Sequence, residues 1–228
     1  MLPQEVRDCY SMRRTALMIL IWLEEIDSRW FGAVLHDGAL VATAAASARE
    51  VVRRAILGSL PSDAPRCIME EPSEESRSTL RMLADLERGN EEDKHFELSS
   101  AYVLEPLRSV LRTAAAIPIG YVSTYGSIAA VAHTEAQIVG RIMATNPIYP
   151  VVPCHRVVGS NLSLTGYRGS RTTPALLAKL DRLRSERQGF AAERNMESAG
   201  ALKVVPVEWA IVRAAKDGVT GDRQLDLW

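Results

Sequence analysis

The stretch Val152-Pro153-Cys154-His155-Arg156-Val157-Val158 places a single cysteine directly beside a histidine. Only the thiolate form of a cysteine attacks well, and an adjacent imidazole is a common way to generate it near neutral pH. An isolated cysteine, with its ordinary pKa of about 8.5, would be mostly protonated. A Cys-His pair alone is weak evidence, because a buried cysteine is more often a small core residue. Whether this Cys-His pair is reactive or structural therefore has to be judged from the flanking segments.

Those segments make the motif specific. Asn146-Pro147-Ile148-Tyr149-Pro150 precedes it, and the polar, glycine-containing run of residues 159–169 follows it. Together with Ile-Pro-Ile-Gly-Tyr-Val-Ser-Thr-Tyr-Gly at residues 117–126, this pattern closely resembles the 6-O-alkylguanine-DNA alkyltransferases, the methylated-DNA–protein-cysteine methyltransferases. The resemblance covers residues 98–187, is faint before them and is absent after residue 190.

Composition predicts a folded protein inside the cell. The 228 residues are 47% hydrophobic, yet no apolar run reaches the roughly 20 residues of a membrane span. Glu5 and Asp8 stand where a signal peptide would be basic. We therefore expect a cytoplasmic location, nucleoid-associated in a prokaryote. Few Asn and Gln beside abundant Arg also hint at a thermophilic source.

The cysteine count argues against a disulfide framework or a zinc site. Cys9, Cys67 and Cys154 are few and scattered, and no Cys-x-x-Cys or paired-histidine spacing occurs. No metal and no cofactor are expected. A bridge between Cys9 and Cys67 is left open, although two unrelated buried thiols are the simpler interpretation.

The net charge of −1 hides an asymmetry between the two halves of the chain. Residues 1–100 carry 12 basic and 18 acidic side chains, whereas residues 101–228 carry 15 basic and 10 acidic ones. A basic half in a near-neutral chain is typical of a protein that binds a polyanion. An ordinary Arg-rich solvated surface explains the charge equally well.

The first part predicts a small antiparallel sheet with helices. Apolar residues 16–25 form one strand, and residues 30–35 and 40–45 pair around the Asp37-Gly38 turn signal. Helices are expected at residues 47–57 and 76–88, and a loop at residues 61–75. We assign residues 1–97 to a structural domain of this kind, within an overall α/β (α+β) fold.

The second part, residues 98–187, predicts a mostly helical domain. A helix from residue 101, with Leu104, Leu107, Val110 and Leu111 on one face, stops before Pro118. Residues 127–132 and 135–143 then form two short helices in a helix-turn-helix pattern, with Thr134 as the second N-cap. An ordinary helical hairpin would give the same pattern. Residues 188–228 form an extension of unknown role whose residues 204–215 look helical.

The family resemblance implies the chemistry. Duplex DNA carrying an alkyl group on guanine O6, mainly methyl, would be the partner, with the damaged base flipped out of the stack. Cys154 would take the alkyl carbon, and His155 would relay the thiol proton through a water. The family glutamate that orients this histidine aligns with Asp181, while Glu186 is a weaker candidate. Tyr125 would donate to the leaving guanine, and Asn146 would bridge the recognition helix to the active-site loop.

The resemblance also implies DNA contacts and pocket walls. Small residues four apart on the second helix would press against the minor groove, and Arg168 and Arg171 would contact phosphates. The family arginine that fills the vacated stack is replaced by Gln137, so Gln137 and Arg141 would share that task. The DNA-binding set is therefore Tyr125, Ala136, Gln137, Gly140, Arg141, Arg168 and Arg171, and the pocket set is Met143, Val157, Tyr167 and Arg168.

A thioether offers no leaving group to a simple base, so alkylation of Cys154 would be permanent and each molecule would act once. Two alternatives remain open. A non-catalytic lesion-binding protein of the same family would lack the cysteine, which is present here. A Cys-His hydrolase would turn over esters or amides and explains neither the small-residue helix nor the basic half.

Overall fold

The computed structural model describes residues 18–69, 72–91, 94–187 and 202–219, and its chain divides into two compact units. The first unit is Met1–Leu104 with Pro147–Val151, and the second is Glu105–Asn146 with Val152–Trp228. The functional division predicted at residues 97/98 and 187/188 rests on the family resemblance and remains a proposal.

A four-stranded sheet with the order β3-β2-β1-β4 forms the first unit. β1 (Ile19–Ile26), β2 (Arg29–His36) and β3 (Ala39–Ala46) are antiparallel, as predicted. The β2–β3 turn uses Asp37 and Gly38 at positive φ, which is the backbone an Asp-Gly hairpin turn requires. The loop predicted at residues 61–75 is partly wrong, because it contains β4 (Arg66–Met69), which pairs in parallel with β1. The sheet is therefore mixed.

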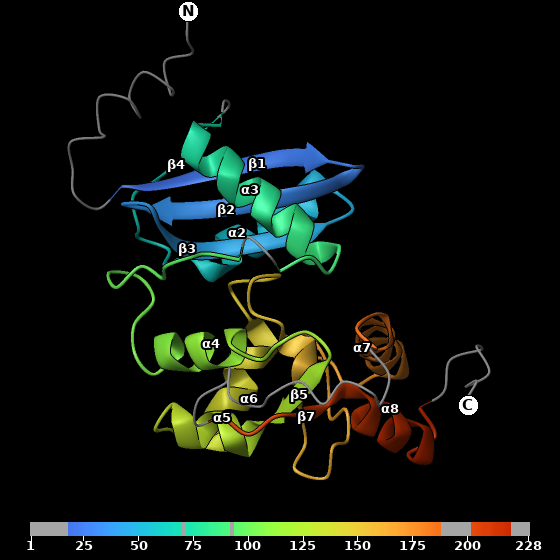
Figure 1. Ribbon diagram of the computed structural model, residues 1–228. Coiled ribbons are helices and arrows are strands. Elements are labelled where there is room, and N and C mark those ends of the chain that lie inside the picture. The colour runs from blue at the N-terminus through green and yellow to red at the C-terminus, as the bar shows by residue number, and fades with distance from the viewer. Residues whose placement is uncertain (1–17, 70–71, 92–93, 188–201, 220–228) are drawn as a thin grey trace, which may run out of the picture. The chain divides into compact units, whose positions relative to one another are not determined.

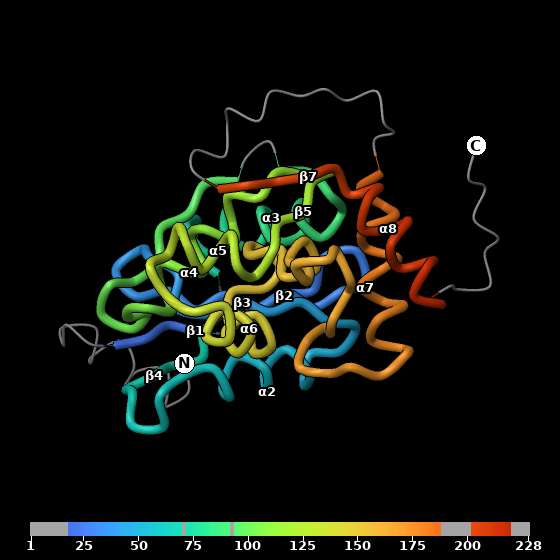
Figure 2. Tube along the Cα trace, turned by 90° about the horizontal axis from the view of Figure 1, so that it is seen from below, coloured from blue at the N-terminus to red at the C-terminus, as the bar shows by residue number. Residues whose placement is uncertain are grey.

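Helices α2 (Arg49–Ser59) and α3 (Glu74–Glu87) cover opposite faces of this sheet, as Figures 1 and 2 both show. α2 approaches closely because Gly32 has no side chain: a Cβ there would lie 2.3 Å from Ile56 and 2.6 Å from Val52. The N-cap of α3 is Ser73, whose hydroxyl accepts from the Ser76 amide. Both helices agree with the sequence prediction to within two residues.

The segment Pro147–Val151 is anchored in this unit although it precedes Cys154 by only a few residues. The Thr43 amide donates to Pro147 O, and its buried hydroxyl donates to Tyr149 O, both at 2.8 Å. The Tyr149 hydroxyl donates to Glu87, which also accepts from Arg29. Main-chain and side-chain bonds therefore fix the stretch of chain that leads from Asn146 to the Cys-His motif.

The second unit is mostly helical around a small sheet of order β6-β5-β7. β5 (Tyr121–Thr124) pairs in parallel with β6 (Val157–Val158) and antiparallel with β7 (Val205–Pro206). The 3₁₀ turn η1 (Cys154–Arg156) lies immediately before β6. The helices of this unit are α4 (Leu107–Ala115), α5 (Tyr125–Val131), α6 (Ala136–Thr145), α7 (Thr173–Ser185) and α8 (Val207–Lys216).

α5 and α6 form the predicted helix pair, with two corrections nearby. Thr124 caps α5 by accepting from the Ser127 amide, but the N-cap of α6 is Glu135 and not Thr134. α4 begins at Leu107, so Leu104 lies outside it and is largely exposed. The apolar period therefore predicted a helix that begins at residue 101, about two turns before the observed start of α4.

Part of the predicted C-terminal extension is an integral piece of the second unit. The Val207 amide donates to Gly120 O, and the Ser123 hydroxyl donates to Lys203 O. Residues of α8 share one apolar core with β5, β6 and α7, made of Val122, Val158, Leu164, Leu180, Leu183, Val207, Ala210, Ile211 and Ala214. Figure 2 shows α8 beside α7. The predicted helix is confirmed, and Trp209 is half-exposed on it.

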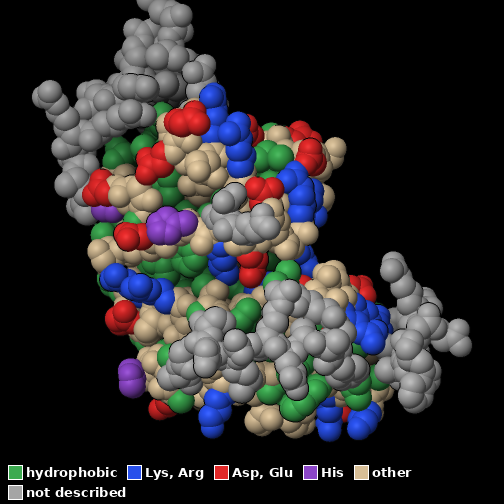
Figure 3. Space-filling model, in the orientation of Figure 1, with side chains coloured by type: hydrophobic (Ala, Val, Ile, Leu, Met, Phe, Trp, Pro, Cys, Tyr) green, Lys and Arg blue, Asp and Glu red, His purple; other side chains and the backbone are tan. Residues whose placement is uncertain are grey.

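Charges of both signs are interspersed on the first unit. Figure 3 shows acidic and basic side chains side by side over the α3 face, where Arg88 pairs with Asp85 and Asp27. Across the ranges that the structure describes, every helix is too short or too polar to cross a bilayer. Cys9 lies outside those ranges, so its pairing with Cys67 stays untested.

Candidate active site

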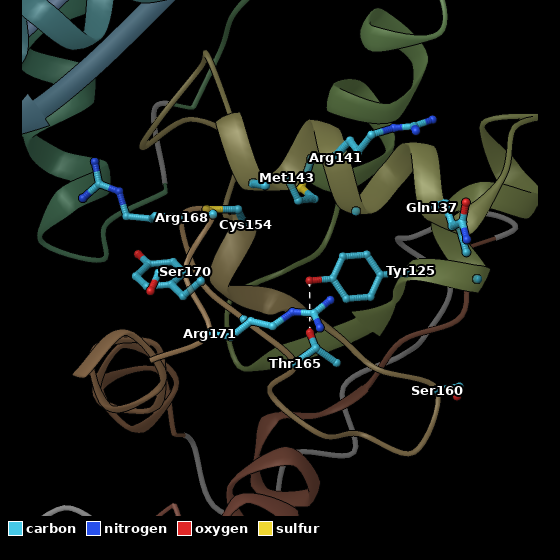
Figure 4. Close-up of a pocket in the computed structure, with 17 residues that line it drawn as sticks. Tyr125, Gln137, Arg141, Met143, Cys154, Ser160, Thr165, Arg168, Ser170 and Arg171 are labelled. Atoms are coloured by element: carbon cyan, nitrogen blue, oxygen red, sulfur yellow. Dashed lines mark hydrogen bonds between the residues drawn. The ribbon is translucent and has the colours of Figure 1, made fainter. Parts of the chain in front are cut away.

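Cys154 begins the turn η1 and lines a pocket of about 730 Å³. Only 4% of the residue is exposed. The pocket lies between α6 and the loop of residues 160–171, and Figure 4 shows Cys154 beside Met143 of α6. The sulfur is therefore shielded from bulk water and borders a cavity.

Asn146 follows the last turn of α6 and reaches the segment before the cysteine. Its Nδ2 donates to Val152 O at 2.8 Å. A hydrogen bond from Asn146 to the Cys154 sulfur also opposes the effect of burial on the pKa of that thiol. The side-chain amide of Asn146 therefore links α6 to the segment that carries Cys154, which is the bridge expected from the family resemblance.

A buried network holds His155. Its Nε2 lies 2.7 Å from Glu186 Oε1, and the same carboxylate accepts two hydrogen bonds of 2.8 Å from Arg156. Arg156 NH1 donates to Ile117 O, so the guanidinium is bound from both sides. His155, Arg156 and Glu186 are each less than one-tenth exposed. The imidazole is consequently fixed in one orientation.

The prediction that Asp181 orients His155 is wrong. The Asp181 side chain is 72% exposed and pairs with Arg184 along the surface of α7. Glu186, at the C-cap of α7, is the carboxylate that reaches the histidine. The buried residues of α7 are Lys179, Leu180 and Leu183, and Glu186 follows at the same helical spacing. Asp181 falls on the other side of the helix.

Cys154 is a thiol in the resting protein. Burial raises its pKa, and the Asn146 hydrogen bond and the charges of Lys179 and Arg168 only partly oppose this. Desolvation disfavours the charged form of a buried group, which is why burial has this effect on the thiol. Attack has to be coupled to removal of the thiol proton.

His155 is suited to accept that proton. Burial lowers its pKa, and Glu186 restores only part of the loss, so the imidazole is neutral near pH 7. A neutral ring that donates from Nε2 to Glu186 keeps its lone pair on Nδ1. That Nδ1 is buried and bonds to no residue that the structure describes. The free lone pair is the base that proton relay requires.

Tyr125 presents a phenol to the pocket. Burial raises its pKa, so the hydroxyl keeps its proton near neutral pH. Thr165 Oγ1 lies 3.3 Å from this hydroxyl and 2.8 Å from Leu164 O, and Figure 4 shows Arg171 extending toward the Tyr125–Thr165 pair. The protonated phenol can therefore donate a hydrogen bond, either to Thr165 or to a ligand in the pocket.

The pocket brings together most residues predicted from the sequence. Its walls include Tyr125, Ala136, Gln137, Gly140, Arg141, Met143, Cys154, Tyr167, Arg168 and Arg171. Val157, whose backbone groups were predicted to read the guanine edge, is not among the lining residues, because the whole residue is buried. Arg168 holds a positive φ of 49°, a conformation rare for a side chain with a Cβ.

The side of α6 that lines the pocket carries a strip of small residues spaced four apart. Ala136, Gly140 and Ala144 all line the pocket, and a Cβ built on Gly140 meets no atom within 4 Å. The strip is therefore not filled by another part of the described protein. Figure 4 shows Gln137 at the opposite end of α6 from Met143, with Arg141 extending away from Cys154.

Comparison with known proteins agrees with this geometry. Residues 106–188 match the model of the 6-O-methylguanine DNA methyltransferase DNA-binding domain. A methylated-DNA–protein-cysteine methyltransferase of Pyrobaculum aerophilum is 53% identical over 53 residues, which are 23% of this chain and 36% of that protein. The inducible Bacillus subtilis enzyme is 43% identical over 68 residues, 29% of this chain and 38% of its own. The alignments thus span well under half of these relatives.

Solved structures show the same fold over more of the chain. An O6-methylguanine-DNA methyltransferase from Pyrococcus kodakaraensis KOD1 superposes with a TM-score of 0.50 at 23% identity, covering 74% of this chain and 99% of its own. The Mycobacterium tuberculosis protein OGT, solved in complex with DNA, gives 0.52 at 21% identity, covering 74% and 92%. At these identities the similarity concerns the fold.

The fold of this chain is similar to that of the solved O6-methylguanine-DNA methyltransferases. Residues 106–188 are similar to the DNA-binding domain of 6-O-methylguanine DNA methyltransferases.

Proposed function

We propose that this protein repairs duplex DNA by moving an alkyl group, mainly methyl, from guanine O6 to its own Cys154. The observation that carries the proposal is the position of the Cys154 sulfur: it faces a pocket whose other wall is the small-residue side of α6. The family relationship of residues 106–188 supports DNA as the partner. A cytoplasmic or nucleoid location follows from that substrate.

The reaction is a displacement at the alkyl carbon. As the Cys154 sulfur attacks, its proton passes through a water to His155 Nδ1, and Glu186 stabilises the imidazolium that forms. The new S–C bond replaces the C–O6 bond, whose electron pair leaves with guanine. The Tyr125 hydroxyl donates a hydrogen bond to the departing base, and Tyr167 packs against it. The thioether product is stable, so each chain reacts once.

Mass spectrometry of the intact protein tests this proposal directly. After incubation with duplex DNA carrying O6-methylguanine, we expect a gain of one methyl group per chain, located on Cys154 by peptide mapping. The extent of reaction should stop at one equivalent, because nothing in the site regenerates the thiol. Ester or amide turnover would favour a hydrolase, and tight binding without a mass gain would favour a lesion-binding protein.

Gly140 offers a test of the α6 surface. Gly140→Ala should raise the free energy of unfolding by about 0.5–1 kcal/mol, because alanine is the better helix former. The same methyl group would stand between α6 and the minor groove, so DNA affinity should fall several-fold, and further in Gly140→Leu. Thermal unfolding and DNA titration measure the two effects.

Gly58 is the matched control, since it also lies in a helix with no atom near its Cβ position. Gly58→Ala should stabilise its unit similarly and leave DNA affinity unchanged. Equal DNA affinity of Gly140→Leu and the unsubstituted protein would argue against α6 as the recognition helix.

Gln137 and Arg141 are proposed to fill the gap left by the flipped base. Replacing both with Ala should slow repair of duplex DNA about tenfold, because flipping costs a few kcal/mol that these side chains offset. Reaction with free O6-benzylguanine, which requires no flipping, should keep its rate. Arg54→Ala, an exposed arginine of the first unit, is the control. Wild-type duplex repair by the double variant would disprove the shared role.

A further inference from the structure

Lys179 is a fully buried lysine without an acidic partner. It lies on α7 with no exposed surface, and none of the described carboxylates pairs with it. Lysine is almost never fully buried unless it is paired, because transfer of an ammonium group out of water is costly. A lysine retained in such a place requires a specific reason.

Its ammonium group instead binds three backbone carbonyls. Nζ donates to Val157 O at 2.6 Å, to Leu164 O at 2.9 Å and to Gly166 O at 3.1 Å. These three donors are the full hydrogen-bonding capacity of a protonated lysine. The first carbonyl belongs to the strand that leaves the Cys-His motif, and the other two belong to the returning stretch. One side chain therefore closes the base of the loop between them.

The clamped stretch carries two groups that face the pocket. Thr165, whose hydroxyl lies within hydrogen-bond distance of the Tyr125 hydroxyl, stands between the two acceptors Leu164 and Gly166. Tyr167 follows directly and lines the pocket. Loss of the three hydrogen bonds from Lys179 would release both positions at once.

The charge of Lys179 also acts on the nucleophile. Besides burial, Cys154 is the titratable group that affects the pKa of Lys179, and Lys179 in turn lowers the pKa of Cys154. Burial lowers the pKa of Lys179 to about 8, so the ammonium form predominates at neutral pH. The other groups that act on the Cys154 charge are Asn146 and Arg168, both nearer the surface than Lys179.

We propose that Lys179 is a positioning residue for alkyl transfer: its buried ammonium fixes the loop that carries Thr165 and Tyr167 and stabilises the negative charge that develops on the Cys154 sulfur. This inference rests on the proposed function. A neutral donor could fix the carbonyls, but only a cation can serve both purposes in a site that excludes water.

The experiment measures alkylation of Cys154 by iodoacetamide between pH 6 and 10, which needs neither DNA nor base flipping. Lys179→Met removes charge and donors, whereas Lys179→Gln removes the charge and keeps an amide donor. In both variants the rate at pH 7.5 should fall about tenfold, as expected for a rise of one unit in the pKa of the thiol. Lys203→Met, at an exposed lysine of the same unit, should match the unsubstituted protein.

An unchanged pH profile in folded Lys179→Met would overturn the proposal. A change in Lys179→Met that is absent from Lys179→Gln would overturn the claim that the charge of Lys179 stabilises the Cys154 thiolate.

If neither variant folds, the effect of Cys154 on the pKa of Lys179 is measured instead. The chain has four lysines, so ¹³C-lysine NMR can follow Lys179. Cys154→Ser should lower the pKa of Lys179, and an unchanged pKa would refute the coupling. Failure of the proposed function itself would appear separately, as absence of methyl transfer from DNA.

Discussion

Replacing Cys154 with Ser should reduce alkyl transfer from O6-methylguanine DNA by at least about a thousandfold. A serine hydroxyl is a far weaker nucleophile than a thiolate, and Cys154 is the one thiol among the residues that line the pocket. Intact-mass measurement over hours should show no methyl gain. The smaller oxygen fits the same space, so the fold and the pocket should be retained.

Duplex DNA binding provides the control for this variant. The small-residue side of α6 and the pocket arginines are unchanged, so Cys154→Ser should bind DNA with the affinity of the unsubstituted protein. Clearance of the lesion by the serine variant would contradict Cys154 as the acceptor. Loss of DNA binding would instead show that the substitution had disturbed the fold.

In the proposed reaction Cys154 starts as a thiol, so it has to lose its proton before or during its attack on the alkyl carbon. Burial raises the pKa of Cys154 and lowers that of His155, so the resting pair is neutral. In the proposed mechanism, proton transfer to His155 through the bridging water then accompanies attack on the bound base. A resting thiol is also less reactive toward stray electrophiles, which matters for a residue that is used once.

Local signals in the sequence located most elements of the first unit. The Asp37-Gly38 pair fixed a hairpin, because only residues that tolerate positive φ form that turn. β4 escaped prediction because its four residues sit in a stretch rich in Pro, Ser and Glu. They become a strand only by pairing with β1, which lies more than 40 residues earlier. That stabilisation is non-local, and no short window of sequence contains it.

The site was predictable in its nucleophile but not in its supporting residues. The motif around Cys154 identified the reactive group, whereas alignment of α7 selected Asp181 in place of Glu186. Helical spacing separates the two carboxylates, since Leu183 and Glu186 share a side of α7 with the buried Lys179, at i, i+4 and i+7, and Asp181 does not. Lys179 carried no comparable signal, because its three acceptors are backbone carbonyls that any residue supplies.

Glu186→Ala should lower the free energy of unfolding by about 3–5 kcal/mol, since it leaves the buried Arg156 without its anion. Glu186→Gln, which keeps the shape, should lose less stability, yet its transfer rate should still drop about a hundredfold because the imidazolium is no longer stabilised. Asp181→Asn is the matched control and should change unfolding by under about 0.5 kcal/mol. Equal effects of the Glu186 and Asp181 changes would contradict the assignment of the orienting carboxylate.

Acid unfolding of the unsubstituted protein should report the same network. Burial alone would raise the pKa of Glu186, but hydrogen bonds from His155 and Arg156 outweigh it and lower the pKa to about 2. The folded pKa lies below the unfolded value of 4.5, so this stability is complete above pH 4.5 and is lost as the pH falls toward 2. About 3 kcal/mol is involved. His155 adds a loss that begins below pH 6.5, because burial lowers its pKa and the unfolded chain binds the proton first. In Glu186→Gln the unfolding free energy should stay flatter between pH 4.5 and 2, and a curve as steep as that of the unsubstituted protein would place the acid-sensitive group elsewhere.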